Sequence, residues 1–333
     1  MLAIKNWLQK IQLPVRETTK PYLILHHADK ILYDFSSLLH GFNSHNLTPY
    51  VYLNNDNAYE DLITKCESYY LCREESEVIK ENLDQIANDI DDTEIVVELG
   101  PGSKSSFNKK TLVLIDKLAR LKKYISVDIS EDSAKAAAVL ARKYNNALSS
   151  SYIVEFFESF NINVKGSVKK TFILFGSTLG NFSEDEAARL IENVSRNMNK
   201  GDKFLITLDT NQNATSLKAA YNNQFIRKLV FNSLFVIDRK LNCNIDFNSI
   251  SLNYAWNKEE SEVEYFFVSS VTQNIRYNGI SLEITKDKKY PFIRSRKFDS
   301  FSVQRYFTKY DLDLLKTYKD DNNRMVVFLF VKK

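Results

Sequence analysis

The sequence is poor in glycine, proline, cysteine and histidine, and each shortage excludes something. Its 333 residues include 8 glycines, 5 prolines, 3 cysteines and 4 histidines. Three unevenly spread cysteines (Cys66, Cys72 and Cys243) give no disulfide framework and fit a reducing compartment. All four histidines lie within the first 45 residues, and Cys66 and Cys72 lack C-x-x-C spacing. We therefore expect no metal site, and we place His26 and His27 in a helix or turn near the surface.

The chain also lacks a charge imbalance and a long apolar run. Its 45 Lys and Arg residues nearly balance 42 Asp and Glu residues, and the two signs are interleaved. A basic stripe of the kind that binds nucleic acid is therefore absent. No run of about 18 apolar residues occurs, and the amphipathic residues 1–17 lack the apolar core of a signal peptide. We expect a globular, monomeric, cytoplasmic protein without nucleic-acid or membrane partners.

The spacing of apolar residues divides the chain into three parts. Residues 1–90 have apolar positions at helical spacing, interrupted by an Asn-rich loop at about residues 43–57. From Glu94, short β-rich runs alternate with helical segments, which predicts an α/β fold with a doubly wound, mostly parallel sheet over residues 91–212. Residues 213–333 contain a long helical segment, antiparallel-looking strands, a helix in DLDLLKTY and a final strand. We expect this last part to form an α+β substrate-binding cap.

A glycine-rich turn follows the first strand of the predicted sheet. In VVELGPGSKSS, residues 96–106, Gly100 and Gly102 let the backbone approach a ligand without an intervening Cβ. The next strand, YISVDIS, ends with Asp128, where a doubly wound fold places an acid that accepts hydrogen bonds from both ribose hydroxyls. Ser130 is better placed than Asp128 to cap the following helix.

This motif is compatible with a dinucleotide or with S-adenosylmethionine. The third glycine of G-x-G-x-x-G is absent, since residue 105 is Ser, and Pro101 lies inside the loop. An uncharged glycine-rich turn suits the methionine moiety better than a pyrophosphate. We therefore favour methyl transfer over hydride transfer.

A second glycine-rich loop, FGSTLGNF at residues 175–182, contains two of the eight glycines. With VVELGPGS and YISVDIS upstream, it resembles the histidine-specific, S-adenosylmethionine-dependent α-N-methyltransferases that make trimethylhistidine for ergothioneine, and their relatives acting on other amino acids. The family segment I-T-E-L-P-E-Y-Y-P-T-R is similar to ITKCESYYLCR, residues 63–73, and the pattern E-x-S-x-K to EITKDK, residues 283–288. The resemblance covers the chain from about Tyr52 onwards, and implies a Rossmann-like class I methyltransferase sheet and a small-molecule amino-acid substrate.

The resemblance implies that Asn181 binds the substrate's α-amino group. An amide carbonyl can accept an N–H of the amine and aim the nitrogen lone pair at the sulfonium methyl. Ser183 with Glu186 can cap the next helix as a capping box, which leaves Asn181 free. Gly176 and Gly180 would let the backbone pass close to cofactor and substrate.

The resemblance also assigns the remaining site residues. Tyr52 and Tyr221 map to tyrosines that hold the substrate carboxylate, and Tyr69 to one near its side chain. Glu283, assisted by Thr285, maps to a glutamate that accepts an imidazole N–H. The predicted substrate-binding residues are thus Tyr52, Tyr69, Asn181, Tyr221, Glu283 and Thr285. The predicted cofactor-binding residues are Glu98, Gly100, Gly102, Ser103, Asp128, Ser159, Phe160, Gly176 and Ser177.

Methyl transfer from a cation to a neutral amine needs positioning more than covalent chemistry from the protein. An α-amine is mostly protonated at neutral pH and must lose a proton before attack. Water or Tyr52 is expected to take that proton, so Asn181 and Tyr52 are the predicted catalytic residues.

The chain departs from the family pattern at several positions. Glu60 stands where a Phe is usual, Asp56 and Asn57 replace a Gly-Ser pair, and Tyr265 replaces the Met of an I-E-M strand. Ser159 replaces the acid that reads the adenine amino group. Two alternatives stay open: an N-methyltransferase for another amino acid or an aromatic amine, indicated by a solvent-facing Glu283 and a pocket lined by Tyr265, and a non-catalytic relative that binds S-adenosylmethionine.

Overall fold

The computed structural model describes residues 15–16, 23–41, 47–54, 57–164 and 168–333. Most of the amphipathic residues 1–17, together with His45 and Asp56, lie outside these ranges. Among the described residues, no helix combines the length and apolar character that a membrane span requires.

An eight-stranded sheet with the order β1-β4-β3-β2-β5-β6-β13-β12 forms the centre of the molecule. The strands from β1 to β6 in this order are parallel, whereas β13 runs antiparallel to β6 and β12 antiparallel to β13. Their bounds are β1 Val15–Arg16, β2 Ile95–Leu99, β3 Lys123–Asp128, β4 Ser149–Val154, β5 Lys170–Leu174, β6 Lys203–Asp209, β12 Leu312–Lys319 and β13 Met325–Lys332. The prediction of a doubly wound, mostly parallel sheet is confirmed.

Helices cover both faces of this sheet, so its central strands are buried on both sides and consist of continuous apolar runs. On one face, alternate residues such as Val96 and Leu205 join a core with α5, α6, α8 and α9. On the other face, Val97 and Phe204 pack with α10 and α13. The bounds are α5 Leu71–Glu81, α6 Leu83–Asp89, α7 Lys104–Lys109, α8 Thr111–Ile115, α9 Glu131–Tyr144, α10 Glu184–Asn197 and α13 Ser300–Thr308.

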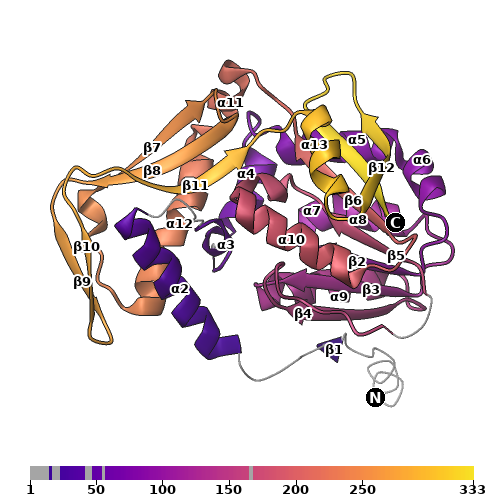
Figure 1. Ribbon diagram of the computed structural model, residues 1–333, viewed down its shortest axis with the longest axis horizontal. Helices are drawn as coiled ribbons and strands as arrows, with labels where there is room; N and C mark the ends of the chain where they lie inside the picture. The colour runs from indigo at the N-terminus through magenta and orange to yellow at the C-terminus, as the bar shows by residue number, and fades with distance from the viewer. Residues whose placement is uncertain (1–14, 17–22, 42–46, 55–56, 165–167) are drawn as a thin grey trace, which may run out of the picture.

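A second body of structure lies beside the carboxyl ends of β6 and β5 (Figure 1). It contains the three-stranded antiparallel sheet β11-β8-β7 and the hairpin β9-β10. These strands are β7 Ile250–Asn257, β8 Glu262–Ser269, β9 Gln273–Tyr277, β10 Ile280–Ile284 and β11 Tyr290–Arg296. The helices packed with them are α2 Leu23–His40, α3 Thr48–Val51, α4 Ala58–Lys65, α11 Ala214–Tyr221 and α12 Gln224–Leu241, with the short turns η1 Thr178–Asn181 and η2 Phe247–Ser249.

Two secondary-structure predictions were wrong. DLDLLKTY is not a helix, because Leu312–Lys319 pairs with the apolar strand β13 as β12 and extends the central sheet. The segment Tyr290–Arg296 was not expected to be a strand, yet it is β11. The division of the chain at residues 90 and 212 stays a prediction, although β12 and β13 belong to the same sheet as β2–β6.

Candidate functional site

The strand order reverses at the carboxyl ends of β2 and β5. These two strands are neighbours, but the chain continues from β2 towards β3 and from β5 towards β6, on opposite sides. In a doubly wound sheet, ligands bind where the strand order reverses in this way. Both glycine-rich loops of the sequence follow these two strands, so the sheet brings them together.

The first loop follows β2 and is shaped by two glycines in the left-handed region. Gly100 has φ +66° and Gly102 has φ +71°, which other residues adopt only with strain. A Cβ on Gly100 would lie 3.2 Å from Cζ of Phe157, so a side chain there would crowd the loop. Ser103 caps α7 by accepting a hydrogen bond from the Ser106 N–H at 3.2 Å. The loop therefore presents backbone rather than side chains to the crevice.

Asp128 ends β3 beside this loop, as expected. Its Oδ1 accepts the N–H of Ser130 at 2.8 Å, while Ser130 itself caps α9. Burial raises the pKa of the Asp128 carboxyl to about 6, although backbone N–H bonds from Ser130 and Ile129 oppose the shift. The carboxylate is ionised at neutral pH and keeps an oxygen for a ligand hydroxyl.

Glu98 lies under the first loop rather than inside the crevice. Its carboxylate is buried and accepts hydrogen bonds from the hydroxyls of Thr111 and Tyr124. Burial raises its pKa to about 7, while those two hydrogen bonds oppose the shift. Glu98 therefore acts in this structure as a support for the end of β2, and its predicted cofactor contact stays a prediction.

The predicted adenine-reading residues lie beyond the strand end. Phe160 is 1% exposed in the core on the α10 face, and Ser159 is exposed on the turn, where its hydroxyl donates to Glu155 Oε1 at 3.0 Å. The acid at the carboxyl end of β4 is instead Glu155, which directly follows Val154 and is followed by Phe156. In the sequence, the strand run SSSYIV followed directly by an acid is the signal that could have identified Glu155. The predicted adenine contacts of Ser159 and Phe160 stay predictions.

The second loop, after β5, is held by a carboxylate from the N-terminal part of the chain. Glu75 on α5 accepts hydrogen bonds from the Gly176 N–H and the Thr207 hydroxyl, and pairs with Lys110 Nζ at 2.7 Å. Burial lowers the pKa of Lys110, but the charge and hydrogen bond of Glu75, together with the nearby Cys72 and Glu98, raise the pKa overall. Because Lys110 follows the first loop, Glu75 ties the two loops together. Sequence reasoning missed this residue.

Ser177 and Gly176 bend the second loop. Gly176 has φ +83° and Ser177 has φ +52°, a left-handed conformation that is uncommon for serine. The Ser177 hydroxyl accepts the Asp209 N–H at 2.8 Å, which binds the loop to the end of β6. The Gly176 N–H is already used by Glu75, so Gly176 contributes room for a ligand rather than a donor.

Asn181 ends η1 and is free of the capping task. Ser183 caps α10 and forms the predicted capping box with Glu186, whose carboxylate accepts the Ser183 N–H at 2.8 Å. The half-buried Asn181 side-chain amide makes no hydrogen bond with any residue that the structure describes. An amide in that state at the carboxyl edge of the sheet is available to a ligand.

Gly180 serves a different contact from the one expected. A Cβ at this position would lie 2.6 Å from the carbonyl oxygen of Arg296 and 3.3 Å from its nitrogen. The end of β11 therefore crosses directly over η1, and only glycine leaves space for that backbone. The expectation that Gly180 makes room for cofactor and substrate is replaced by this packing role.

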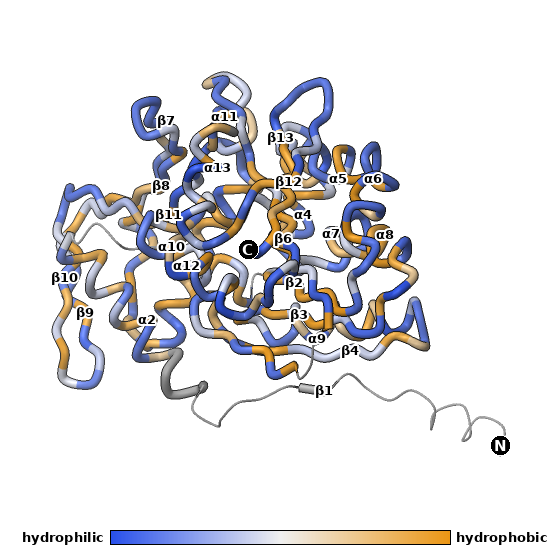
Figure 2. The backbone as a smooth tube through the Cα atoms, turned by 45° about the vertical axis from the view of Figure 1, so that its right-hand side comes forward, coloured by the Kyte–Doolittle hydropathy of each residue, from blue (hydrophilic) through white to orange (hydrophobic). Residues whose placement is uncertain are grey.

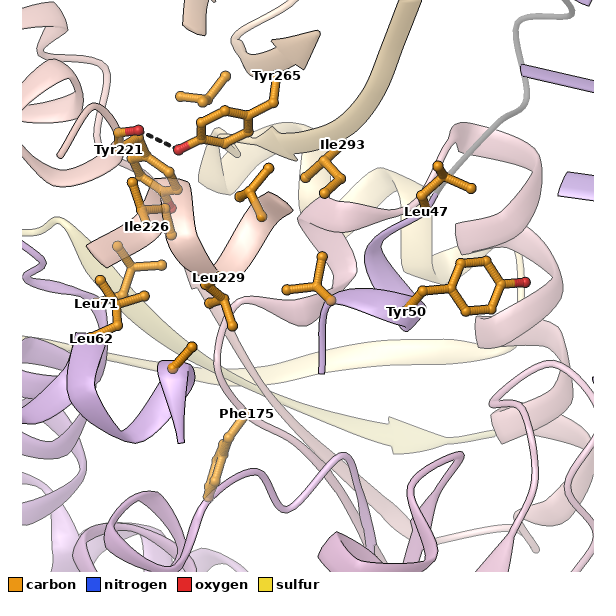
Figure 3. Packing of buried hydrophobic residues seen from close by; sticks show 14 of the residues in the cluster. Leu47, Tyr50, Leu62, Leu71, Phe175, Tyr221, Ile226, Leu229, Tyr265 and Ile293 are labelled. Carbon is orange, nitrogen blue, oxygen red and sulfur yellow. Dashed lines mark hydrogen bonds between the residues drawn. The ribbon is translucent and has the colours of Figure 1, made fainter. Parts of the chain in front are cut away.

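The three predicted tyrosines lie in one group of aromatic side chains. The ring centroids of Tyr69 and Tyr221 lie 6.0 Å apart, and those of Tyr52 and Tyr59 lie 5.4 Å apart. Tyr265 is buried and donates its hydroxyl to the backbone carbonyl of Tyr221 (Figure 3). Burial first, and the neighbouring phenols second, raise the pKa of Tyr69 well above its ordinary value. These phenols are therefore hydrogen-bond donors at neutral pH.

The structure argues against Tyr52 as the base. Burial and the nearby charge of Asp128 raise the pKa of the Tyr52 hydroxyl to about 12. A phenol with this pKa keeps its proton at neutral pH and does not accept one from an ammonium group. Tyr52 can donate a hydrogen bond to a carboxylate, and water is left as the proton acceptor.

Glu283 and Thr285 are misplaced for a substrate site. Glu283 lies on β10 and is exposed, and its carboxylate accepts a hydrogen bond from the Thr285 hydroxyl at 3.0 Å. The β9-β10 hairpin lies at the outer end of the molecule beside α2 in both views (Figures 1 and 2). A solvent-facing carboxylate there cannot select a buried imidazole, so this assignment was wrong.

The last three positions of the pattern E-x-S-x-K fit a different segment. In IRSRK, residues 293–297, Ser295 and Lys297 take the Ser and Lys positions and Ile293 takes that of Glu. The Ser295 hydroxyl lies 3.2 Å from the Tyr221 hydroxyl, and Ile293 pairs with Tyr265 across β11 and β8. This stretch was missed because its strand was missed.

The residues present fit S-adenosylmethionine. Two glycines hold open the first loop, a Cβ would fill the space beside Phe157, and an ionised Asp128 lies where a ribose binds. The described residues contain no cluster of three or more His, Cys, Asp or Glu side chains arranged for a metal ion. Together with the strand order, the site defines a class I, S-adenosylmethionine-dependent methyltransferase.

Comparison with known proteins gives the family. The model for "Histidine-specific methyltransferase, SAM-dependent" matches residues 41–332, and the chain belongs to this family. It is 25% identical to the histidine N-alpha-methyltransferase of Mycobacterium tuberculosis over 68% of this chain and 71% of that protein. It is 23% identical to the ergothioneine biosynthesis protein 1 of Neurospora crassa over 49% of this chain, but only 19% of that longer protein.

The chain is also similar, at low sequence identity, to solved structures. An S-adenosylmethionine-dependent methyltransferase from Clostridium acetobutylicum is 14% identical, with a TM-score of 0.43, covering 83% of this chain and 97% of that chain.

Proposed function

We propose that the protein transfers a methyl group from S-adenosylmethionine to the α-amino group of an amino acid, with L-histidine as the first acceptor to be tested. The observation that carries this proposal is the position of Asn181. Its half-buried amide has no hydrogen-bond partner among the described residues, and it lies in the loop after β5 at the switch point of the sheet. The mycobacterial relative, which is named for methylation of the histidine α-nitrogen, supports the choice of acceptor.

The roles of the chain's own residues follow from their geometry. The cofactor supplies the electrophilic methyl group. The Asn181 carbonyl orients the amine, and the phenols of Tyr52 and Tyr221 donate hydrogen bonds to the acceptor's carboxylate. Three fixed contacts of this kind hold the nitrogen in line for attack, a positional effect worth several kcal/mol, about 7–11 at most. Water accepts the proton that the ammonium group must lose.

The second candidate is the same reaction on a different amino acid or on an aromatic amine. The exposed Glu283 meets one of its two conditions, whereas Tyr265 is buried and donates its hydroxyl to the backbone carbonyl of Tyr221. Ile293, buried to 7% exposure, stands opposite Tyr265 and offers no acceptor for an imidazole N–H. Turnover of L-histidine compared with L-tryptophan and L-tyrosine separates the two candidates.

Substitution of Asn181 tests the proposal. We expect Asn181→Ala to bind S-adenosylhomocysteine like the wild type in calorimetry, but to lose at least about 100-fold in kcat/KM for the amino acid, since a misplaced nucleophile costs that much. Asn193→Ala is a matched control, because that amide is already occupied by hydrogen bonds to the backbone carbonyls of Phe157 and Phe160. Unchanged turnover in Asn181→Ala would remove the amine-binding role.

A further inference from the structure

A buried ammonium group lies directly behind the phenol of Tyr221. Lys297 Nζ is 2.8 Å from Asp209 Oδ2, 2.7 Å from the Tyr221 hydroxyl and 2.9 Å from the Ser295 hydroxyl. The side chains of Lys297 and Asp209 are both 0% exposed. An ammonium group has three N–H donors and no acceptor, so these three oxygens use all of them.

The direction of these bonds fixes the proton of Tyr221. Because Lys297 only donates, the Tyr221 oxygen accepts, and its own O–H must point elsewhere. Among the described residues, the acceptor within reach of this O–H is the Ser295 hydroxyl at 3.2 Å, which already accepts from Lys297. A hydrogen bond from a cation also polarises the phenol and strengthens its O–H as a donor.

The network lies at the same edge of the sheet as Asn181. Phe298 donates its N–H to the Asp209 carbonyl at 2.8 Å, and the Arg296 carbonyl passes over Gly180. Residues 295–298 therefore cross between the end of β6 and the Asn181 loop. An acceptor whose nitrogen is bound by Asn181 has its carboxylate within the reach of this crossing segment and of Tyr221.

Further hydrogen bonds fix the Asp209 carboxylate, which in turn holds the Lys297 ammonium group in place. Its Oδ2 also accepts the Tyr70 hydroxyl at 2.8 Å, and its Oδ1 accepts the Asn211 N–H at 3.0 Å. A fully buried ion pair is costly to form and contributes little net stability. Its placement behind a phenol at the active edge indicates a role in function.

Resting on the proposed function, we propose that Lys297 is a positioning residue that, held by Asp209, sets the Tyr221 hydroxyl as a donor to the substrate carboxylate. The O–H turns from Ser295 to the carboxylate when the acceptor binds. The enzyme therefore selects acceptors that carry a carboxylate next to the amine and discriminates against the corresponding decarboxylated amines.

The test compares kcat/KM for L-histidine with that for histamine, or, if another amino acid is the better acceptor, that amino acid with its decarboxylated amine. We expect Tyr221→Phe and Lys297→Met each to reduce the preference for the carboxylate about 10- to 100-fold, the value of a hydrogen bond to a charged group. The kcat/KM for the amine should change less than about threefold. The double variant should show the preference of Tyr221→Phe alone, because Lys297 acts through that phenol.

A matched control is another buried ion pair, Lys170 with Asp202, at 2.7 Å and 3% and 1% exposure at the opposite end of the strands. When Lys170 is replaced, the Asp202 carboxylate still accepts hydrogen bonds from backbone N–H groups. In the same way, Asp209 still accepts hydrogen bonds from Tyr70 and Asn211 when Lys297 is replaced. Lys170→Met should lower the melting temperature but leave the carboxylate preference unchanged. If Lys297→Met does not fold, Asp209→Asn/Lys297→Met removes both charges and gives the same readout.

The outcomes are distinguishable. An unchanged preference in Lys297→Met, with a reduced one in Tyr221→Phe, overturns the positioning role and leaves the proposed function intact. Equal losses of kcat/KM for the amino acid and for the amine would show that Lys297 has a merely structural role, and would also overturn the positioning role. If the wild type methylates no amino acid, the proposed function fails, and this inference fails with it.

Discussion

Gly180 offers the sharpest test of how the two bodies of the molecule meet. If glycine were present only for chain flexibility, alanine would stabilise the protein by about 0.4–1 kcal/mol, because it restricts the unfolded chain. The structure predicts the opposite sign. An alanine Cβ would lie 2.6 Å from the Arg296 carbonyl oxygen, and ordinary contact begins at 3.4 Å, so backbone must move by about 0.8 Å.

Overpacking of this kind costs about 1–3 kcal/mol, and we expect Gly180→Ala to lose that much free energy of unfolding in urea titration. Asn181 is the next residue, so the same displacement should reduce turnover by up to about 100-fold while S-adenosylhomocysteine still binds. Gly279→Ala is the control: its Cβ meets nothing within 4 Å, but φ is +81°, so it should cost about 1 kcal/mol with no effect on turnover. A stabilised or unchanged Gly180→Ala variant would refute the packing of β11 on η1.

Two further predictions concern pH. The raised pKa of Glu98, about 7 against an ordinary 4.5, means that the folded state binds a proton that the unfolded state has lost, so stability falls as pH rises from 4.5 to 7. The full shift is worth about 3 kcal/mol, and urea unfolding at several pH values should show a loss that is larger by this amount in the wild type than in Glu98→Gln; parallel profiles would contradict it. For Asp128, with a pKa of about 6, calorimetry should show that affinity for S-adenosylhomocysteine weakens below pH 6 as the carboxylate is protonated. Asp128→Asn should bind weakly at every pH, and a wild-type affinity that is flat from pH 5 to 8 would exclude the ribose contact.

Much of the fold follows from local sequence pattern. Strands of the parallel sheet such as β2, IVVEL, are apolar runs that need burial on both faces. Helices α9 and α10 begin at the recognisable caps Ser130 and Ser183. The two missed strands share a physical cause. In β11 the register shifts between Pro291 and Ile293, and in β12 between Leu314 and Lys316. A bulge breaks the period-2 alternation on which strand prediction depends.

The site was predictable only where a short motif carries it. Gly100, Gly102, Asp128 and Asn181 were placed correctly at the carboxyl edge because a doubly wound sheet dictates that position.

The supporting groups were not predictable, since Glu75 meets Gly176 and Asp209 meets Lys297 across long stretches of chain. A buried charge whose partner lies far away in the sequence leaves no local sequence pattern from which the pair can be predicted. Glu283 was misassigned because the matching pattern in β11 begins with Ile293 instead of an acid.

The central claim is tested most directly by mass spectrometry of the protein incubated with S-adenosylmethionine and each of the twenty amino acids. We predict 14-Da increments on at least one amino acid, abolished when its α-amine is blocked and lost in Asn181→Ala. Failure of every amino acid to gain mass, from a protein that binds S-adenosylhomocysteine in calorimetry, would contradict the account.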